Sequence, residues 1–343
     1  MTEKTHSSSN NYAGRWKDFP HYILDITWEI WEGRGVRTLH EYYADDIPVR
    51  SPAGLVVGNQ NVISATLATI AEFPDRELLG QDVIWSVQDN GHHLSSHRIL
   101  STATHDGDGA FGAATGTKLK YLVLADCAAR GQTIDDEWLI RDLGAIVRQL
   151  GWDPKDYAAD MIEKEGGVDK ASAPFSPTID EPGPYDGKGN TDPWGVAYAA
   201  ILQRIMAGDL SVVKSHYDRA CETHYAGGLQ ESGWGAADRF WSALRSAFPN
   251  ARFTIEHQIG REDRFMPPRA AIRWSLEGKH EGWGAFGEPT GADVYVMGIS
   301  HVEFGPFWGD GDTAPKASIR REWALYDEVA IWKQILMRTR RTA

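Results

Sequence analysis

Two copies of one pattern run through the amino-acid sequence, and this internal repeat restricts the possible folds more than any other feature. The copies match in the same order when they are shifted by 175 positions: Phe73-Pro74 with Phe248-Pro249, Arg98 with Arg273, His105 with His280, Phe111-Gly112 with Phe286-Gly287, and Thr115-Gly116 with Thr290-Gly291. The shift becomes 185 at Asp142 and Asp327, because the segment from Gly305 to Lys316 lengthens one hairpin of the second copy. Ordered repetition of this length predicts a tandem duplication, with two domains of about 130 to 150 residues.

Each copy ends on a strand that gives way to a helix at an aspartate. Read as strands, the two segments place Trp138 with Asp142, and Trp323 with Asp327, on one face. An indole beside a carboxylate in an apolar recess raises the pKa of the carboxylate, which suits general acid–base chemistry near neutral pH. The alternative is that both aspartates only cap the helices that follow them, while His105 and His280 are loop residues at strand ends.

The order of elements predicts the α+β class. Each copy begins with three short helical patterns, at residues 22–31, 36–43 and 62–73 and again at 194–206, 210–217 and 236–248. Strand-like segments follow, at 83–87, 95–104, 118–125 and 134–142 in the first copy, and a loop is expected around Pro48, Pro52 and Gly54. Helices followed by several antiparallel strands are typical of α+β domains.

Composition sets the domain boundaries and the class of partner. Residues 1–18 are polar and predict a disordered tail, and residues 153–192 are rich in Pro, Gly and Asp and predict a linker, so the domains are 19–152 and 193–343. The net charge of -13 argues against nucleic acid and anionic membranes and favours a small-molecule substrate. Two cysteines without CxxC spacing, and no apolar run long enough to span a bilayer, favour a cytoplasmic protein.

Several other motifs give weak signals. The glycines at 107, 109 and 112, repeated at 282, 284 and 287, match GxGxxG, but no helix is expected to follow them, so glycine-rich hairpin loops are the better interpretation. Asp106, Asp108, Asp310 and Asp312 lack the glutamate of a calcium-binding EF-hand loop. His92-His93 lacks the spacing of a zinc site. We therefore expect no metal and no cofactor.

At the repeated positions the sequence resembles the SnoaL-like polyketide cyclase family, also called ester cyclases, of the nuclear transport factor two superfamily. The matching motifs are Phe73-Pro74-Asp75, Thr104-His105-Asp106-Gly107, Ala114-Thr115-Gly116, Glu137-Trp138, Asp142 and Gln149-Leu150-Gly151 in the first copy, and Phe248-Pro249-Asn250, His280, Pro289-Thr290-Gly291, Glu322-Trp323, Asp327 and Gln334-Ile335 in the second. The resemblance implies two tandem cone-shaped α+β barrels, each with three helices closing a strongly curved, mostly antiparallel sheet around a pocket.

The resemblance also implies roles for individual residues. Asp327 would be the general acid or base, with His280 or His224 as its polar partner, and Asp142 and His105 would do the same in the first pocket. Substrate-binding residues would be His224, Arg273, Trp274, Trp323 and Glu322 in the second copy, and Trp138 and Glu137 in the first. Glu137 and Glu322 stand where many cyclases have a histidine, and Arg50 and Ile99 stand opposite His224 and Trp274, so the pockets should differ, with the second better equipped.

Two functions follow from these expectations. The first is a cofactor-independent lyase or isomerase, of cyclase, dehydratase or retro-aldol type, acting on an apolar, aromatic or polycyclic small molecule. The second is a non-catalytic protein of the same fold that binds a small molecule or dimerises. In both cases the tandem copies would form an internal pseudo-dimer, with homo-oligomers a further possibility, and Asp327→Asn would separate turnover from binding.

Overall fold

The computed structural model describes residue 12, residues 14–305 and residues 318–341. These residues form two six-stranded sheets with the same strand order, β2-β1-β6-β5-β4-β3 and β8-β7-β12-β11-β10-β9. The first sheet consists of β1 (Pro48–Ser51), β2 (Gly54–Val57), β3 (Glu77–Val87), β4 (His92–Thr104), β5 (Lys118–Arg130) and β6 (Thr133–Arg141). The second consists of β7 (Tyr217–Tyr225), β8 (Leu229–Ser232), β9 (Arg252–Arg261), β10 (Arg269–Lys279), β11 (Asp293–Gly305) and β12 (Ser318–Tyr326). The predicted α+β class is confirmed, and within both sheets only β1–β6 and β7–β12 pair in parallel.

The helices repeat in the same way. In the first half they are α1 (Phe19–Thr27), a π-helix (Trp28–Glu32), a short 3-10 turn (Val36–Thr38), α2 (Leu39–Tyr42), α3 (Asn59–Glu72) and α4 (Leu143–Gln149). In the second half they are α6 (Pro193–Met206), α7 (Ser211–His216), α8 (Trp234–Ala247) and α9 (Glu328–Arg341), and α5 (Pro154–Lys164) and a 3-10 turn (Pro177–Ile179) lie between the halves. Helices α3 and α8 both follow a glycine with positive φ, at Gly58 and Gly233, where a side chain would be strained.

The loop expected around Pro48, Pro52 and Gly54 is instead a β-hairpin, formed by β1 and β2. Pro48 begins β1, and Pro52 lies in the turn, so neither ring removes an interior ladder hydrogen bond. His224 lies on β7. Its partner across the ladder is Trp323, and Arg50 pairs in the same way with Trp138, so Arg50 and His224 are equivalent positions.

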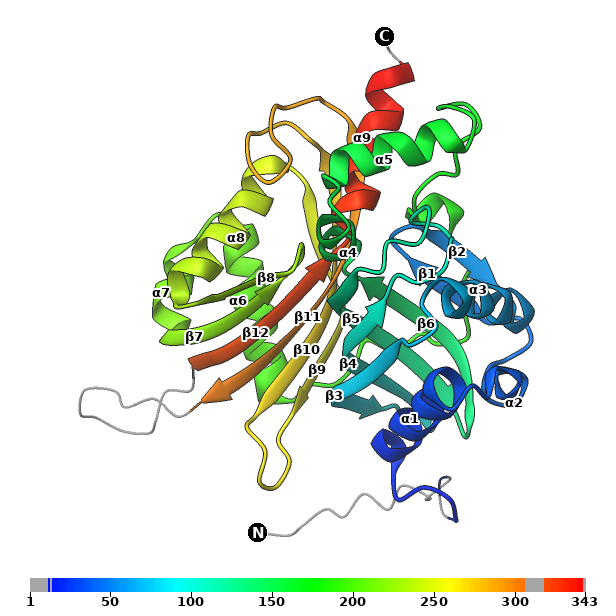
Figure 1. Cartoon of the computed structure of the whole chain (residues 1–343). Coiled ribbons are helices and arrows are strands. Elements are labelled where there is room, and N and C mark those ends of the chain that lie inside the picture. Colours follow the sequence, from blue (N-terminus) through cyan, green and yellow to red (C-terminus); the bar gives the residue numbers. More distant parts are fainter. Residues whose placement is uncertain (1–11, 13, 306–317, 342–343) are drawn as a thin grey trace, which may run out of the picture.

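Each sheet has one face toward its own helices and one face toward the other sheet (Figure 1). On β6 the alternate residues Glu137, Leu139 and Arg141 face the helices, because all three border the cavity described below. The opposite face of β6 and β12 contributes Ile140 and Leu325 to one buried cluster that joins the two sheets. We call this contact between the sheets the seam.

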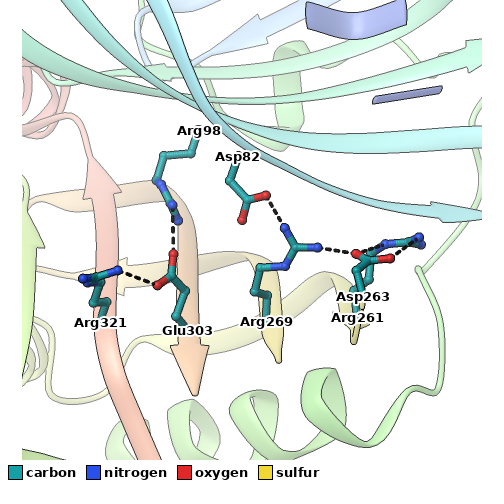
Figure 2. Close-up of polar contacts among 7 residues, drawn as sticks. All are labelled: Asp82, Arg98, Arg261, Asp263, Arg269, Glu303 and Arg321. Atoms are coloured by element: carbon teal, nitrogen blue, oxygen red, sulfur yellow. Dashed lines mark hydrogen bonds and ion pairs between the residues drawn. The ribbon is translucent and has the colours of Figure 1, made fainter. Parts of the chain in front are cut away.

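Charged side chains and indoles occupy much of the seam. Arg98 of the first sheet lies 3.4 Å from the ring centroid of Trp323, and Arg273 of the second sheet lies 3.5 Å from that of Trp138. Figure 2 shows the neighbouring ion pairs, in which Arg98 contacts Glu303 at 3.2 Å and the buried Arg269 contacts Asp82. The contacts are reciprocal between equivalent positions, as expected for two copies related by an approximate twofold axis.

Two segments predicted to lack structure are ordered. Residues 153–192 contain α5, which begins at Asp153-Pro154, where the Asp153 side chain accepts a hydrogen bond from the backbone N–H of Lys155. This helix packs against α9, and its Tyr157 and Ile162 are buried there. In the expected tail, Tyr12 and Trp16 are buried in the first core. The linker and tail assignments are therefore wrong at these places, while residues 1–11, residue 13 and the inserted segment 306–317 lie outside the described residues.

No helix in the described ranges is long and apolar enough to cross a membrane.

Candidate functional site

The first domain holds a cavity of about 200 Å³ between its sheet and its helices. Its walls are largely apolar and come from α1, α3 and the inward faces of β4, β5 and β6, including Ile26, Val62, Ile99, Val123 and Leu139. Its charged and larger polar groups come from several elements, with two of them on β6: Tyr43, Arg76, His97, Tyr121, Glu137 and Arg141. An apolar hollow with a few converging polar groups is typical of a small-molecule site.

Glu137 is the carboxylate of this cavity. Its residue is 6% exposed, and burial raises the pKa of its carboxyl group to about 7, an effect that the charge of Asp136 adds to. The Tyr43 hydroxyl acts in the opposite direction as a hydrogen-bond donor to the ionised form. A carboxyl group with this pKa can accept and return a proton at neutral pH.

His97 lies two strands away from Leu139 on the same wall of the cavity, through the pairs His97 with Ala125 and Ala125 with Leu139. Burial and the charge of Arg98 lower the pKa of His97 to about 3, so the imidazole is neutral. Its Nε2 atom is buried without a hydrogen-bond partner in the described residues. A neutral imidazole at a cavity wall can form a hydrogen bond with a ligand oxygen.

The second domain places Glu322 where the first places Glu137, but its surroundings are closed. Glu322 is 0% exposed and accepts hydrogen bonds from Tyr198 (2.8 Å), Tyr217 (2.6 Å), Trp241 (3.2 Å) and Tyr225. None of the main cavities in the described part of the chain includes it. Four donors saturate this carboxylate, which makes it a structural group in a filled core.

The first domain lacks three of these four donors. Tyr43 stands at the position of Tyr217, since the two residues bridge Ile134 and Ile319 respectively. The other three donors, Tyr198, Tyr225 and Trp241, are replaced by smaller side chains that border the cavity. These are Ile23 on α1, Ser51 at the end of β1 and Thr66 on α3. The cavity therefore occupies the space that aromatic side chains fill in the second domain.

A residue difference on the central strands also fills the interior of the second domain. Trp274 takes the place of Ile99 on the central strand, and its ladder partner is Gly298 where Ile99 has Val123. A Cβ atom on Gly298 would come within 2.1 Å of the Trp274 ring, so the glycine makes room for the indole. The Trp274 indole N–H donates to Ser300 at 2.9 Å. The second pocket was expected to be the better equipped one, but Trp274 occupies the space in the second domain that corresponds to the first-domain cavity.

Asp142 and Asp327, the predicted acid–base residues, do not border the cavity. Both lie at the seam at the start of a helix, where Asp142 accepts from the backbone N–H of Ala145 (3.0 Å) and Asp327 accepts from Val329 (2.8 Å). Asp142 also accepts hydrogen bonds from Gly227 (2.8 Å) and Gly228 (2.9 Å) of the other half. Trp138, Ile140 and Asp142 share one strand face, as predicted. That face packs against the other sheet, so Asp142 lies at the seam and not in the cavity.

Burial nevertheless raises the pKa values of both aspartates, to about 6 for Asp142 and about 7 for Asp327. Backbone N–H groups oppose the shift in each case, and the charge of Asp142 adds to the shift of Asp327. The direction predicted from the neighbouring indoles is therefore correct. The cause is burial at the contact between halves and not a ligand pocket.

His105 and His280 are fully buried residues that hold a loop. Nδ1 of His105 lies 3.1 Å from Thr115, and Nδ1 of His280 lies 3.1 Å from Thr290. The carbonyl oxygen of each histidine accepts from the N–H groups of the following Thr-Gly pair. Neither histidine is among the residues that border the cavity, so the expected catalytic placement is not met.

The aromatic and basic residues predicted to bind substrate also lie elsewhere. Trp323 is stacked between His224, whose ring centroid is 5.4 Å away, and Arg98. Trp138 lies between Arg50 and Arg273. Trp138, Arg273 and Trp274 do border a second cavity of about 270 Å³ at the seam.

The polar groups of the seam cavity are mostly paired already. Arg273 contacts Asp126 at 3.1 Å, and Glu256 accepts from Ser275 at 2.6 Å. The Tyr185 hydroxyl lies 2.7 Å from Nε2 of His257. These contacts join the halves and leave few groups free for a ligand.

In the described ranges, no three His, Cys, Asp or Glu side chains form a group that could hold a metal ion.

Comparison with known proteins places the second half in a family. Residues 196–335 match the family model described as SnoaL-like polyketide cyclase. None of the curated proteins compared with the chain matches it. Similar solved structures include IdmH, a proposed polyketide cyclase from Streptomyces antibioticus, with 21% identity over 43% of this chain and 100% of that one and a TM-score of 0.33.

A proposed polyketide cyclase from Acidithiobacillus ferrooxidans is also similar, with 21% identity over 38% of this chain and 91% of that one and a TM-score of 0.33. TsrD from Streptomyces laurentii has 17% identity over 38% of this chain and 93% of its own, with a TM-score of 0.32. The match to the SnoaL-like polyketide cyclase family therefore covers the second domain, and the first domain repeats the same strand order.

Proposed function

We propose that the first domain catalyses proton transfer on a small, largely apolar molecule, with Glu137 as general base and acid. The observation that carries this proposal is the contrast between two equivalent carboxylates. Glu322 accepts four hydrogen bonds in a filled core, whereas Glu137 borders a cavity with Tyr43 as its hydrogen-bond donor. A raised pKa in a cleft is a recognised mark of an acid–base residue.

The proposed step is the removal of a proton from a carbon next to a carbonyl group. The ionised Glu137 carboxylate accepts the proton, an enolate forms, and the protonated carboxyl group later returns the proton to carbon or oxygen. This step is shared by aldol ring closure and by loss of water from a β-hydroxy ketone. In retro-aldol cleavage the same carboxylate would accept the proton of the β-hydroxyl group, and breaking of the C–C bond would give the enolate. The description of the family as polyketide cyclases supports this class of chemistry through the fold that the two domains share, since the family match itself covers residues 196–335.

His97 is the candidate partner for the substrate oxygen. Because its pKa is lowered to about 3, it stays neutral over the working pH range. A hydrogen bond from a neutral imidazole can stabilise a developing enolate without a net charge in the cavity. The unpartnered Nε2 atom supports this role.

The second candidate function, a binding or scaffold protein, is favoured for the second domain alone. Trp274 and Trp241 fill its interior, and its sheet supplies Arg269 and Arg273 to the seam. We propose that this half supports the first domain and has no reaction of its own.

Deuterium exchange tests the proposal without knowledge of the natural substrate. The full chain is incubated in D₂O with propiophenone or with 3-benzoylpropanoate, and exchange at the carbon next to the ketone is followed by NMR. We expect exchange above the buffer rate in the wild type, a loss of at least about 100-fold in Glu137→Gln, and no loss in the matched control Glu322→Gln. The proposal would be contradicted if the wild type exchanged no faster than the buffer, or if Glu137→Gln exchanged as fast as the wild type.

A further inference from the structure

Two arginines lie at the end of the first-domain cavity away from Glu137. Arg141 is the last residue of β6, four positions after Glu137 on the same strand face, and Arg76 immediately precedes β3. At about 3.3 Å per residue, the Cα atoms of Glu137 and Arg141 are about 13 Å apart. The cavity therefore has a carboxylate at one end and guanidinium groups at the other.

Both arginines are half-buried, and no carboxylate of the described residues forms an ion pair with either of them. The fully buried arginines, by contrast, are paired, as Arg98 is with Glu303 and Arg269 with Asp82. The neighbours of Arg76 are the Tyr121 hydroxyl and two positive groups, Arg141 and Arg34. Burial, followed by the charge of Arg141, lowers the pKa of Arg76 to about 10. The Nε atom of Arg141 is buried without a hydrogen-bond partner in the part of the chain described.

Such an arrangement is unfavourable without a ligand. Like charges repel, more strongly where water is partly excluded, and a half-buried guanidinium group without a counter-ion retains part of its desolvation cost. The second domain avoids the problem, because Ala251 and Tyr326 occupy the equivalent positions. The arginine pair thus occurs only in the first domain, at the cavity that Glu137 borders.

We propose that Arg76 and Arg141 bind the carboxylate of a small aromatic acid, whose apolar part fills the cavity toward Glu137. This inference rests on the proposed function, because it names the substrate class of the same site. Two guanidinium forks match the planar carboxylate through paired hydrogen bonds, and the Tyr121 hydroxyl adds a third donor. A cavity of about 200 Å³ holds one aromatic ring with a short side chain, since benzene occupies an engineered cavity of about 150 Å³.

Binding of charged and neutral probes tests this assignment. Isothermal titration of the full chain compares phenylacetate and cinnamate with phenylacetamide and cinnamamide, and phenyl phosphate tests a tetrahedral anion. We expect each carboxylate to bind at least about 10-fold more tightly than its amide, and to lose about 10- to 100-fold in Arg141→Gln and in Arg76→Gln. The surface control Arg37→Gln should keep the preference.

The inference is overturned if the amides bind as well as the carboxylates, if none of the carboxylates binds at 20 mM, or if phenyl phosphate binds most tightly. It is also overturned if Arg141→Gln keeps the wild-type preference for carboxylates. Folding is monitored by thermal unfolding in the same samples. Removal of one arginine relieves repulsion, so without ligand the midpoint temperature of unfolding should be the same in the arginine variants as in the wild type, or higher. Cinnamate should raise this midpoint in the wild type only.

The two proposals can fail separately. Glu137→Gln should retain the preference for carboxylates, because it leaves both arginines in place. Carboxylate binding without deuterium exchange in the wild type would leave the arginine site standing and remove the acid–base role. If propiophenone exchanges deuterium but carboxylates bind no better than amides, the acid–base role would stand and the arginine site would be removed.

Discussion

Glu137 is held in the folded protein in a place that disfavours its charge. Burial raises its pKa from 4.5 to about 7, so between these pH values the folded protein keeps a proton that the unfolded chain has released. Stability therefore falls as the pH rises through this window, and the penalty is complete above pH 7. Since Tyr43 is its hydrogen-bond donor, the charged form is only partly compensated.

The first prediction concerns the stability of Glu137→Gln. The neutral amide removes the penalty of ionisation, so the variant should be more stable than the wild type at pH 8, by up to about 3 kcal/mol. The two proteins should have similar free energies of unfolding near pH 4, where both side chains are neutral. Urea denaturation at the two pH values measures the difference, and the exposed Glu41→Gln serves as the control. A variant that is less stable at pH 8 would show that the charge is well compensated.

The second prediction concerns the pH dependence of deuterium exchange. If Glu137 is the base, the exchange rate in the wild type should rise with pH through one ionisation near pH 7 and then level off. Tyr43 and Cys127 lie close to it in the cavity, Asp136 adds its charge from the opposite face of β6, and His97 and the two arginines lie farther along the cavity. The rate is measured from pH 5 to 9. A flat profile, or a midpoint below pH 5, would assign the base to another group.

The repeated residues could be recognised from the sequence, and they turn out to hold the fold. Gln149, for example, bonds both the N–H and the C=O of Lys120, and Gln334 does the same with Tyr295. Each glutamine ties the final helix of its copy to a strand. Such motifs predict architecture well, because the same contacts are needed wherever the fold occurs.

The proposed chemistry depends instead on positions where the copies differ. The pairs Ile99 with Trp274, Thr66 with Trp241 and Arg141 with Tyr326 can all be aligned in the sequence. Whether these residues border a cavity depends on which face of the strand is turned toward the helices. The alternation of side chains along a strand defines two faces but does not show which one is turned toward the helices. The choice of Trp138 and Asp142 as pocket residues followed from taking the wrong face.

Among the elements, the central strands decide whether a domain is hollow or filled. Trp274 on β10, Gly298 on β11 and the Ser300 hydroxyl form one fitted set in the second domain. The first domain has Ile99, Val123 and Ala125 at these places. Interiors are packed so closely that a large side chain is accepted only with a matching small one.

The third prediction transfers this set to the first domain. Ile99→Trp with Val123→Gly and Ala125→Ser should fill the cavity, because the indole gains the space and the hydroxyl partner that Trp274 has. We expect carboxylate binding and deuterium exchange to fall at least about 10-fold, with a stability change within about 2 kcal/mol. Ile99→Leu, which keeps the side-chain volume, is the control. Full activity in the triple variant would mean that the reaction takes place elsewhere.

Helix α5 shows what composition alone misses at this scale. The segment 153–192 has the Pro, Gly and Asp content of a linker, yet Tyr157, Ile162 and Lys333 tie α5 to α9, with Lys333 at 2.7 Å from Glu165. The Asp153-Pro154 start was a helix signal within a polar stretch. The apolar residues of α5 are buried against α9, which lies far away in the sequence.

At the scale of the whole molecule, the seam makes the two halves depend on each other. A face rich in arginine and carboxylate would normally be exposed to water, but here the other sheet covers it (Figure 2). Asp82 and Arg269 come from different halves, and their side chains are 4% and 3% exposed. Buried ion pairs of this kind stabilise little over apolar residues but penalise the loss of one partner.

The fourth prediction tests that dependence with a double-mutant cycle. Asp82→Ala leaves the buried Arg269 with only the half-exposed Asp263, so it should reduce the free energy of unfolding by about 3–5 kcal/mol. The double variant Asp82→Ala with Arg269→Met should recover much of this loss, because no unpaired charge remains buried. Glu277→Ala, which breaks the exposed pair with Arg252, should change stability by about 0.5 kcal/mol or less. Urea denaturation of the wild type, of Asp82→Ala and Arg269→Met alone, and of the double variant gives the four values of the cycle. Equal losses in Asp82→Ala and in the double variant would mean that the seam is held by its apolar residues and not by its charges.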